Sequence, residues 1–134
     1  MKLAAVSLLV PDYEAGIAFF CDGLGFDLTE NVDQGDKRWV TVTPPGGGCR
    51  LVLVRAEGLQ RAAIGNQAGG RVWLFLHSAD FAADAARIAV AGGVFQEAPR
   101  NEAYGRVAVW RDPWGNLWDL IGPVAQSPVI AVQT

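Results

Sequence analysis

The sequence predicts an α+β fold in which two tandem βαβββ modules curve a mixed sheet around a concave cleft. The chain repeats itself, because an offset of 68 residues aligns Asp12 with Asp80 and Gly25 with Gly93. Both halves show the same order of patterns, namely a β-rich apolar run, a helical stretch and three further strands. Sixteen glycines in 134 residues, many of them in turn-like clusters, are typical of a sheet-rich chain.

The first half begins with an apolar run, Leu3–Val10, that predicts a strand. Asp12 is suited to cap a helix, because its carboxylate can accept the free backbone N–H groups of the first turn. Apolar residues then recur at helical spacing as far as the glycine step Gly23/Gly25. The three strands predicted after this helix are Phe26–Glu30, Arg38–Thr43 and Cys49–Arg55.

The second half follows the same plan. Arg71–His77 predicts a strand, Asp80 caps a helix, and the helix ends at Gly92-Gly93. Three strands follow: Val94–Ala98, Arg106–Arg111 and Leu117–Ile121. The turns Pro44–Gly48 and Asp112–Asn116 are rich in the residue types that hairpins use.

We therefore predict a single domain over residues 1–124, with module 1 at about 3–55, a linker at 56–70 and module 2 at about 71–122. The tail 125–134 lies outside the repeat and is interpreted as an added edge strand, an interface arm or a disordered end. The alternative topology is a ferredoxin-like β-α-β-β-α-β sandwich, which has one strand too few in each half.

Composition excludes several classes of protein. Eleven Lys+Arg against 14 Asp+Glu give a net charge of −3, which argues against nucleic-acid binding and against binding to anionic membranes. No apolar run reaches the ~18 residues that span a bilayer, and Met1-Lys2 does not open a signal peptide. The two cysteines form no C-x-x-C pair, so we expect two thiols in a reducing cytoplasm.

The cap, turn and strand residues of the repeat resemble those of the vicinal oxygen chelate superfamily, which includes glyoxalase I, the bleomycin-resistance proteins and the extradiol dioxygenases. The resemblance spans about residues 3–122 and is carried by these segments: Val10-Pro11-Asp12-Tyr13, Gly23-Leu24-Gly25-Phe26, Asp112-Pro113-Trp114-Gly115-Asn116 and Trp118-Asp119-Leu120. It implies a small-molecule ligand, a homodimer, and one divalent metal held by the first and last strands of each module. Fold alone does not choose among the superfamily's reactions.

The four positions at which the resemblance implies metal ligands are Ala5, Leu51, Trp73 (or Val72 if the register slips by one) and Asp119. Only Asp119 offers an oxygen, whereas a metal site needs three or four donors. We therefore expect no cofactor and a binding protein for a small organic ligand. A divalent-metal lyase or isomerase resembling lactoylglutathione lyase, a dioxygenase-like enzyme and a cofactorless enzyme stay open as alternatives.

Asp119 and His77 are the candidate catalytic residues. Asp119 is either a carboxylate in the cleft that acts as a base or ligand anchor, or a strand residue that faces outward or pairs with an arginine. His77, the one histidine of the chain, is either a proton shuttle at the rim or a residue that packs beside the Asp80 cap.

The candidate ligand-binding residues are of three kinds. They are the aromatic residues Trp73, Phe75 and Tyr104, the charged rim residues Arg38 and Glu102, and the cleft-wall residues Ala5 and Leu51. Core packing is the alternative for any tryptophan, and a solvated loop is the alternative for the polar segment 100–105. The apolar stretch Pro128–Val132 adds a reason to expect a homodimer.

Overall fold

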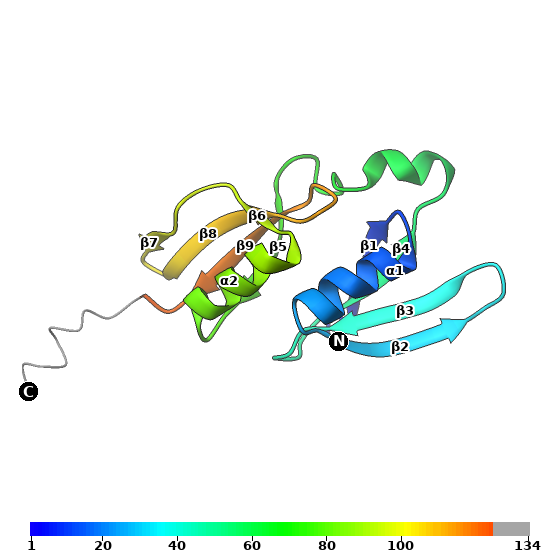
Figure 1. Cartoon of the computed structure of the whole chain (residues 1–134), viewed down its shortest axis with the longest axis horizontal. Coiled ribbons are helices and arrows are strands. Elements are labelled where there is room, and N and C mark those ends of the chain that lie inside the picture. The colour runs from blue at the N-terminus through cyan, green and yellow to red at the C-terminus, as the bar shows by residue number, and fades with distance from the viewer. Residues whose placement is uncertain (125–134) are drawn as a thin grey trace, which may run out of the picture.

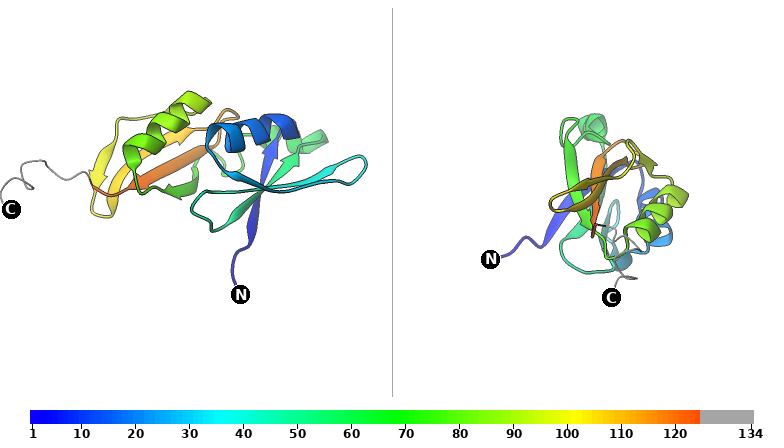
Figure 2. Two further views of the ribbon diagram at one scale, coloured as in Figure 1. Left: turned by 60° about the horizontal axis from the view of Figure 1, so that its bottom comes forward. Right: turned by 90° about the vertical axis from the view of Figure 1, so that its left-hand side faces the viewer.

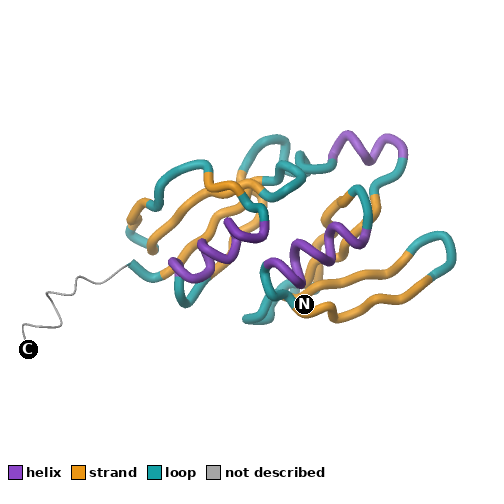
Figure 3. Tube along the Cα trace, viewed as in Figure 1, coloured by secondary structure: helices purple, strands orange, loops and turns teal. Residues whose placement is uncertain are grey.

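A computed structural model, which describes residues 1–124, shows two modules side by side along the long axis of the molecule (Figure 1). Each module pairs a mixed sheet with a helical segment, as colouring by secondary structure makes plain (Figure 3). Among the described residues, no helix has the length and apolar character needed to cross a membrane. The predicted tail 125–134 lies outside the described residues.

Module 1 forms a four-stranded sheet in the order β1-β4-β3-β2, with β1 parallel to β4 and the other pairs antiparallel. Its elements are β1 (Ala5–Val10), α1 (Tyr13–Ile17), the π-helical segment η1 (Ala18–Gly23), β2 (Asp27–Asp33), β3 (Arg38–Thr43) and β4 (Arg50–Arg55). As predicted, Asp12 caps the helix, because its Oδ1 accepts a hydrogen bond from the Ala15 N–H at 2.8 Å.

Module 2 repeats this plan in the order β5-β9-β8-β6, with β7 also paired to β8. Its elements are β5 (Val72–His77), α2 (Phe81–Ala91), β6 (Val94–Phe95), β7 (Arg100–Glu102), β8 (Gly105–Arg111) and β9 (Leu117–Gly122). Asp80 caps α2 through the Ala83 N–H, and Gly92 ends it at φ 114°, a backbone conformation that favours glycine. A 3-10 helix, η2 (Gly58–Ala63), lies between the modules in the sequence.

The α+β fold with two tandem modules is confirmed, and one predicted strand is corrected. The predicted strand Val94–Ala98 is cut short after Phe95, and the predicted loop 100–105 is in fact a hairpin formed by β7 and β8. Glu97 explains the break: its side-chain Oε2 accepts the Val109 N–H at 2.9 Å, so a carboxylate takes the place of a backbone carbonyl. Pro99 has no N–H to donate and also interrupts the strand.

One hydrophobic core joins the two modules. Both helical segments lie on the same side of their sheets (Figure 2), and the core cluster contains residues of both halves. The Phe20 ring of η1 lies 5.9 Å from Trp118 of β9, and Trp118 stacks on Trp110 with ring centroids 5.1 Å apart. We call the sheet face opposite to the helix the outer face of each module. Side chains that alternate with the core residues lie on the outer face.

Candidate functional site

The outer face of module 2 carries a buried carboxylate. In β9, Trp118 and Leu120 belong to the core cluster, so Asp119 between them lies on the outer face. Asp119 is 8% exposed, and its Oδ1 is buried without a hydrogen-bond partner among the described residues. A buried polar oxygen that lacks a donor is energetically unfavourable, and Oδ1 itself has almost no surface in contact with solvent.

The charges around Asp119 come from the segment before β8. Burial is the main cause that raises the pKa of the Asp119 carboxyl group; Arg100 lowers this pKa and Glu97 raises it. Arg100 Nε donates to Glu97 Oε1 at 3.2 Å, and Arg100 Nη1 donates to Glu102 Oε1 at 2.9 Å. Because two other carboxylates engage Arg100, its guanidinium does not form an ion pair with Asp119.

Glu102 and Tyr104 lie next to Arg100. Tyr104, Glu97 and Glu102 all act to raise the pKa of the Arg100 guanidinium, which keeps that group charged. Tyr104 is 65% exposed. Sequence reasoning missed Glu97 and Arg100, because their position depends on the break in the edge strand; the nearest sequence signal is Pro99, which disrupts the strand.

Phe75 is the predicted aromatic residue nearest to Asp119 in the sheet. It lies opposite Asp119 in the parallel β5–β9 pair and is 60% exposed, so an apolar surface adjoins the carboxylate. His77 follows two residues later, opposite Ile121, and makes no hydrogen bond to Asp119 within residues 1–124.

A groove of about 640 Å³ runs along the free edge of β5, between the two modules. Phe75 and His77 lie on one side of it, and Leu51 lies on the other. Leu51 also packs in the core with an exposure of 5%, so its side chain is on the core face of β4. Phe75 therefore borders both the groove and the outer face of module 2.

The strand pairing corrects two of the residue pairs that the repeat predicts to be equivalent. Ser7 pairs with Val52 in module 1 as Phe75 pairs with Asp119 in module 2, so the repeat equivalent of Asp119 is Val52 and not Leu51. A bulge shifts the register of β5 between Val72 and Leu74.

The same bulge decides which residue matches Ala5. Val72 lies opposite Leu117 as Ala5 lies opposite Arg50, so Val72 is the equivalent of Ala5. Trp73 sits at the bulge, half-buried and in contact with the core. The structural equivalents of the expected metal positions are thus Ala5, Val52, Val72 and Asp119.

These residues do not fit a metal site formed by one chain. Alanine and valine side chains have no donor atom, and residues 1–124 contain no group of three or more His, Cys, Asp or Glu placed to hold an ion. The carboxylate that neighbours Asp119, that of Glu97, is engaged by Arg100 and the Val109 N–H.

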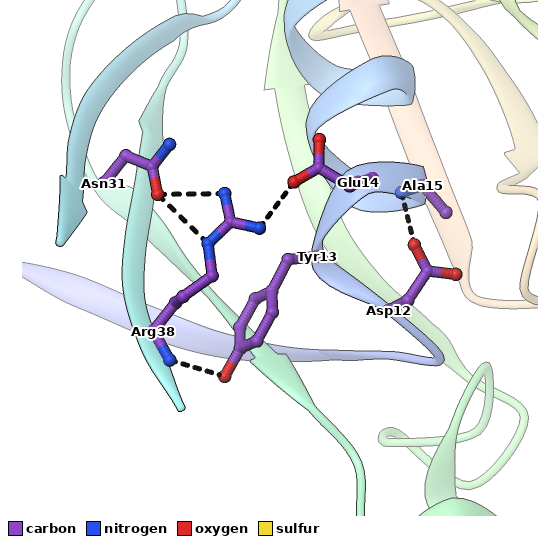
Figure 4. Close-up of polar contacts among 6 residues, drawn as sticks. All are labelled: Asp12, Tyr13, Glu14, Ala15, Asn31 and Arg38. Atoms are coloured by element: carbon purple, nitrogen blue, oxygen red, sulfur yellow. Dashed lines mark hydrogen bonds and ion pairs between the residues drawn. The ribbon is translucent and has the colours of Figure 1, made fainter. Parts of the chain in front are cut away.

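Arg38 is not one of the residues around Asp119. Figure 4 shows it in module 1, where its guanidinium binds Asn31 Oδ1 and pairs with Glu14 of α1. The guanidinium also lies 5.2 Å from the ring centroid of Tyr13, whose hydroxyl accepts the Arg38 N–H. These contacts connect β3 to the start of α1 and satisfy the predicted rim charge internally.

A group of polar side chains on the outer face of module 1 is satisfied within the chain. Thr29 Oγ1 lies 3.0 Å from the hydroxyls of both Thr41 and Thr43. Glu30 Oε1 accepts hydrogen bonds from Thr41 and from Arg50 at 3.1 and 2.9 Å. Trp39, Thr41 and Arg50 together lower the pKa of Glu30, so this carboxylate is stabilised in its charged form.

Comparison with known proteins agrees with this architecture. The sequence model of the Glyoxalase/Bleomycin resistance protein/Dioxygenase superfamily matches residues 2–120. An uncharacterized protein from Shewanella frigidimarina (strain NCIMB 400) is 46% identical over 132 residues, which cover 96% of this chain and 98% of the relative.

Two solved structures from Streptomyces sp. CB03234 are similar as well. The structure of TnmS3, described as an antibiotic binding protein, has 31% sequence identity and a TM-score of 0.72, and the match covers 92% of this chain and 96% of TnmS3. A glyoxalase/bleomycin resistance protein has 31% identity and a TM-score of 0.68, with coverage of 90% of this chain and 99% of that protein.

Proposed function

Since the chain belongs to the Glyoxalase/Bleomycin resistance protein/Dioxygenase superfamily, we propose that it binds a small organic ligand on the outer face of module 2 without a resident metal. The observation that carries this proposal is the Asp119 carboxylate, which is buried, has a raised pKa and has an Oδ1 with no partner in the described part of the chain. A ligand hydroxyl or amine that donates to this carboxylate offsets part of the unfavourable burial.

The surroundings of Asp119 indicate what the rest of the ligand is like. Phe75, exposed and opposite Asp119, offers a flat apolar surface for an aromatic or other apolar body. The description of TnmS3 as an antibiotic binding protein supports the binding of an organic compound by this fold. The proposed ligand therefore has an apolar, ring-containing body and at least one hydroxyl or amino group.

A matched set of probes tests this proposal. We expect 2-naphthol and 2-naphthylmethylamine to bind more tightly than naphthalene in a fluorescence titration, because only the first two donate a hydrogen bond. Asp119→Asn should weaken their binding several-fold, because its amide oxygen still accepts a hydrogen bond but carries no charge, and a hydrogen bond to a charged group contributes roughly 1 kcal/mol more than a neutral one. The control is Asp27→Asn, which removes an exposed carboxylate elsewhere. Equal affinity for all three probes, or no effect of Asp119→Asn, would disprove the proposal.

The raised pKa of Asp119 favours a second candidate, an enzyme that uses this carboxylate as a general base. A lyase resembling lactoylglutathione lyase or a dioxygenase-like enzyme would require metal donors beyond those found in residues 1–124. Turnover of a hemithioacetal with added Ni²⁺, Zn²⁺ or Mn²⁺ separates the candidates, because a ligand-binding protein shows no rate above the metal blank.

We also propose that the protein is a cytoplasmic homodimer. Exposed apolar side chains, including Val32, Trp39 and Phe75, lie on the outer faces, and β1 and β5 each have an unpaired edge within the described chain. Light scattering after gel filtration should give about twice the mass of 14.3 kDa. A mass of one chain at micromolar concentration would refute the dimer.

A further inference from the structure

The edge of β1 that pairs with no strand is occupied by a side chain of the linker. Gln67 Nε2 donates to the Ser7 carbonyl at 3.1 Å, and Gln67 Oε1 accepts the Leu9 N–H at 2.8 Å. One residue of a parallel neighbouring strand would make the same two bonds, to the residues on either side of Leu8. A primary carboxamide can make both, because one of its N–H groups and its carbonyl oxygen lie on the same side of one planar group. A carboxamide thus takes the place of a strand at this edge.

The first strand of module 2 presents the same pair of backbone groups. Phase and pairing make Phe75 and His77 of β5 the structural equivalents of Ser7 and Leu9. The Ser78 N–H donates to a carbonyl of β9 at 2.7 Å, so the backbone groups of the alternate residues, His77 and Phe75, point to the free edge. In the part of the chain that the structure describes, no group bonds to the Phe75 carbonyl or to the His77 N–H.

The groove between the modules lies along this edge of β5. Residues 74–79 all line it without a gap. Because successive side chains of a strand point to opposite faces, an unbroken run means that the backbone edge itself borders the space. The volume of about 640 Å³ falls within the ~300–1,000 Å³ that is usual for small-molecule sites, and Phe26, Leu51 and Leu74 are among the apolar residues that line it.

The charged residues of the groove balance each other. Apart from His77, its titratable acidic and basic lining residues outside the cysteine are one carboxylate, Asp84, and one guanidinium, Arg87. The Ser78 hydroxyl donates to Asp84, and Arg87 Nε donates to the Gly23 carbonyl at 3.2 Å, so both charged groups have partners within the chain. A groove of this kind favours a neutral ligand over an ion, because it offers no uncompensated charge.

We propose that this groove binds a neutral organic compound that carries a primary carboxamide or a lactam. One N–H of this group donates to the Phe75 carbonyl, its oxygen accepts the His77 N–H, and the apolar remainder of the ligand lies in the groove. Gln67 makes the equivalent two bonds at β1. A trans peptide group fits less well, because its N–H and its carbonyl point in opposite directions. This site does not depend on the function proposed for Asp119.

Three related probes test the site in a fluorescence or calorimetric titration. We expect 2-naphthamide to bind about fivefold more tightly than methyl 2-naphthoate, which has no N–H, and than N-methyl-2-naphthamide, whose N–H points away from its carbonyl, because each of these loses one hydrogen bond. Equal affinity for all three would overturn the proposal. The probes for Asp119 have a hydroxyl or amino group and no carbonyl, so the two proposals can fail separately.

Two substitutions of one residue form the matched pair of variants. His77→Ala and His77→Pro both remove the imidazole, but only proline also removes the backbone N–H. That N–H makes no bond in the β5–β9 ladder, and proline is tolerated at such an edge position. His77→Pro should bind 2-naphthamide about fivefold more weakly than His77→Ala does, since one hydrogen bond is lost. Equal binding by the two folded variants would overturn the site.

Hydrogen exchange in the wild-type protein tests the same bond without a substitution, and so covers the case in which His77→Pro does not fold. Saturation with 2-naphthamide should slow exchange of the His77 amide, whereas saturation with naphthalene, which has no acceptor oxygen, should leave it unchanged. An exchange rate that 2-naphthamide does not alter, or that naphthalene lowers equally, would overturn the proposed bond.

Discussion

The two modules share a topology but differ in how their outer faces satisfy polar groups. In module 1, the Glu30 carboxylate accepts hydrogen bonds from Thr41 and Arg50, and threonine hydroxyls form a ladder beside it. In module 2, the buried oxygen of Asp119 has no partner, and the nearby arginine is engaged by other carboxylates. The polar groups of the first face are satisfied within the chain, whereas Asp119 Oδ1 on the second face is not satisfied by the described residues.

This difference shows that the repeat specifies the backbone and the core, and that the outer faces are free to diverge. The position of Asp119 corresponds to Val52 in module 1, a side chain with no polar requirement. Function in a duplicated fold can therefore be sought where one copy leaves a polar group unsatisfied and the other does not.

The largest expected effect tests whether the modules share one core. Phe20→Ala should lower the free energy of unfolding by about 4 kcal/mol, because Phe20 is fully buried against Trp118 of the other module. Chemical denaturation gives the value, and hydrogen exchange should show β3 and β8 losing protection together. Phe75→Ala, at an exposed position, is the control and should change stability little. Loss of protection in module 1 alone would contradict a shared core.

The next effect compares the two turns that close the modules. Asp112 accepts the N–H groups of Trp114, Gly115 and Asn116 as well as Asn116 Nδ2 and Trp118 Nε1. Asp112→Ala should cost about 3 kcal/mol, because buried donors lose their acceptor. The module 1 turn has Pro44 instead, where the Gly47 N–H bonds only to a carbonyl. Thermal unfolding of Pro44→Ala should show a much smaller loss; similar losses would mean that the turns are equivalent.

Unlike the substitutions above, Asp119→Asn should increase the free energy of unfolding of the free protein at pH 7, by about 1 kcal/mol. The reason is that burial disfavours the charged carboxylate. The folded protein holds the Asp119 proton more tightly than the unfolded chain does. The wild type therefore loses stability relative to the variant as pH rises from about 4, the ordinary Asp value, through the raised pKa.

Thermal unfolding of both proteins between pH 3 and pH 8 measures this difference, which should vanish at the acidic end. A wild type that gains stability relative to Asp119→Asn as pH rises would show that Asp119 has a partner.

The smallest effect concerns the threonine ladder of module 1. Thr41→Val should destabilise the protein by about 1 kcal/mol, because the fully buried hydroxyl loses bonds to Thr29 and Glu30 while the side-chain shape is kept. Thr43→Val, at a less buried position, should cost less. An increase in stability on Thr41→Val would show that the buried polar groups on the outer face of module 1 are energetically unfavourable as well.

The fold could be predicted from the sequence because its signals are local. The Asp12 and Asp80 caps and the final glycine of α2 act within one turn of their helices, and the structure shows each of them in place. The register between strands could not be predicted in the same way. The bulge after Val72 makes Val72 and not Trp73 the match of Ala5, and one extra residue before β4 makes Val52 and not Leu51 the match of Asp119.

Only part of the candidate site could be predicted from the sequence. Asp119 could be singled out because it stands at a position where the resemblance implies a metal ligand, and the structure brings Glu102 and Tyr104 to its surroundings. Glu97 and Arg100 depend on the tertiary path of an interrupted edge strand, which has no hydrophobic periodicity. Arg38 carries the right charge but is engaged by Glu14 and Asn31, contacts between distant segments that no sequence pattern reveals.

The insertion of the Glu97 side chain into the ladder of β8 has a consequence for how the protein behaves in a crowded solution. The margin of the second sheet ends in two short pieces, β6 and β7, separated by Glu97 and Pro99. A row of backbone groups that is interrupted in this way offers a foreign strand no continuous edge to pair with. The Glu97 carboxylate, which neighbours Asp119, therefore also makes this margin a poor template for fibrous self-assembly.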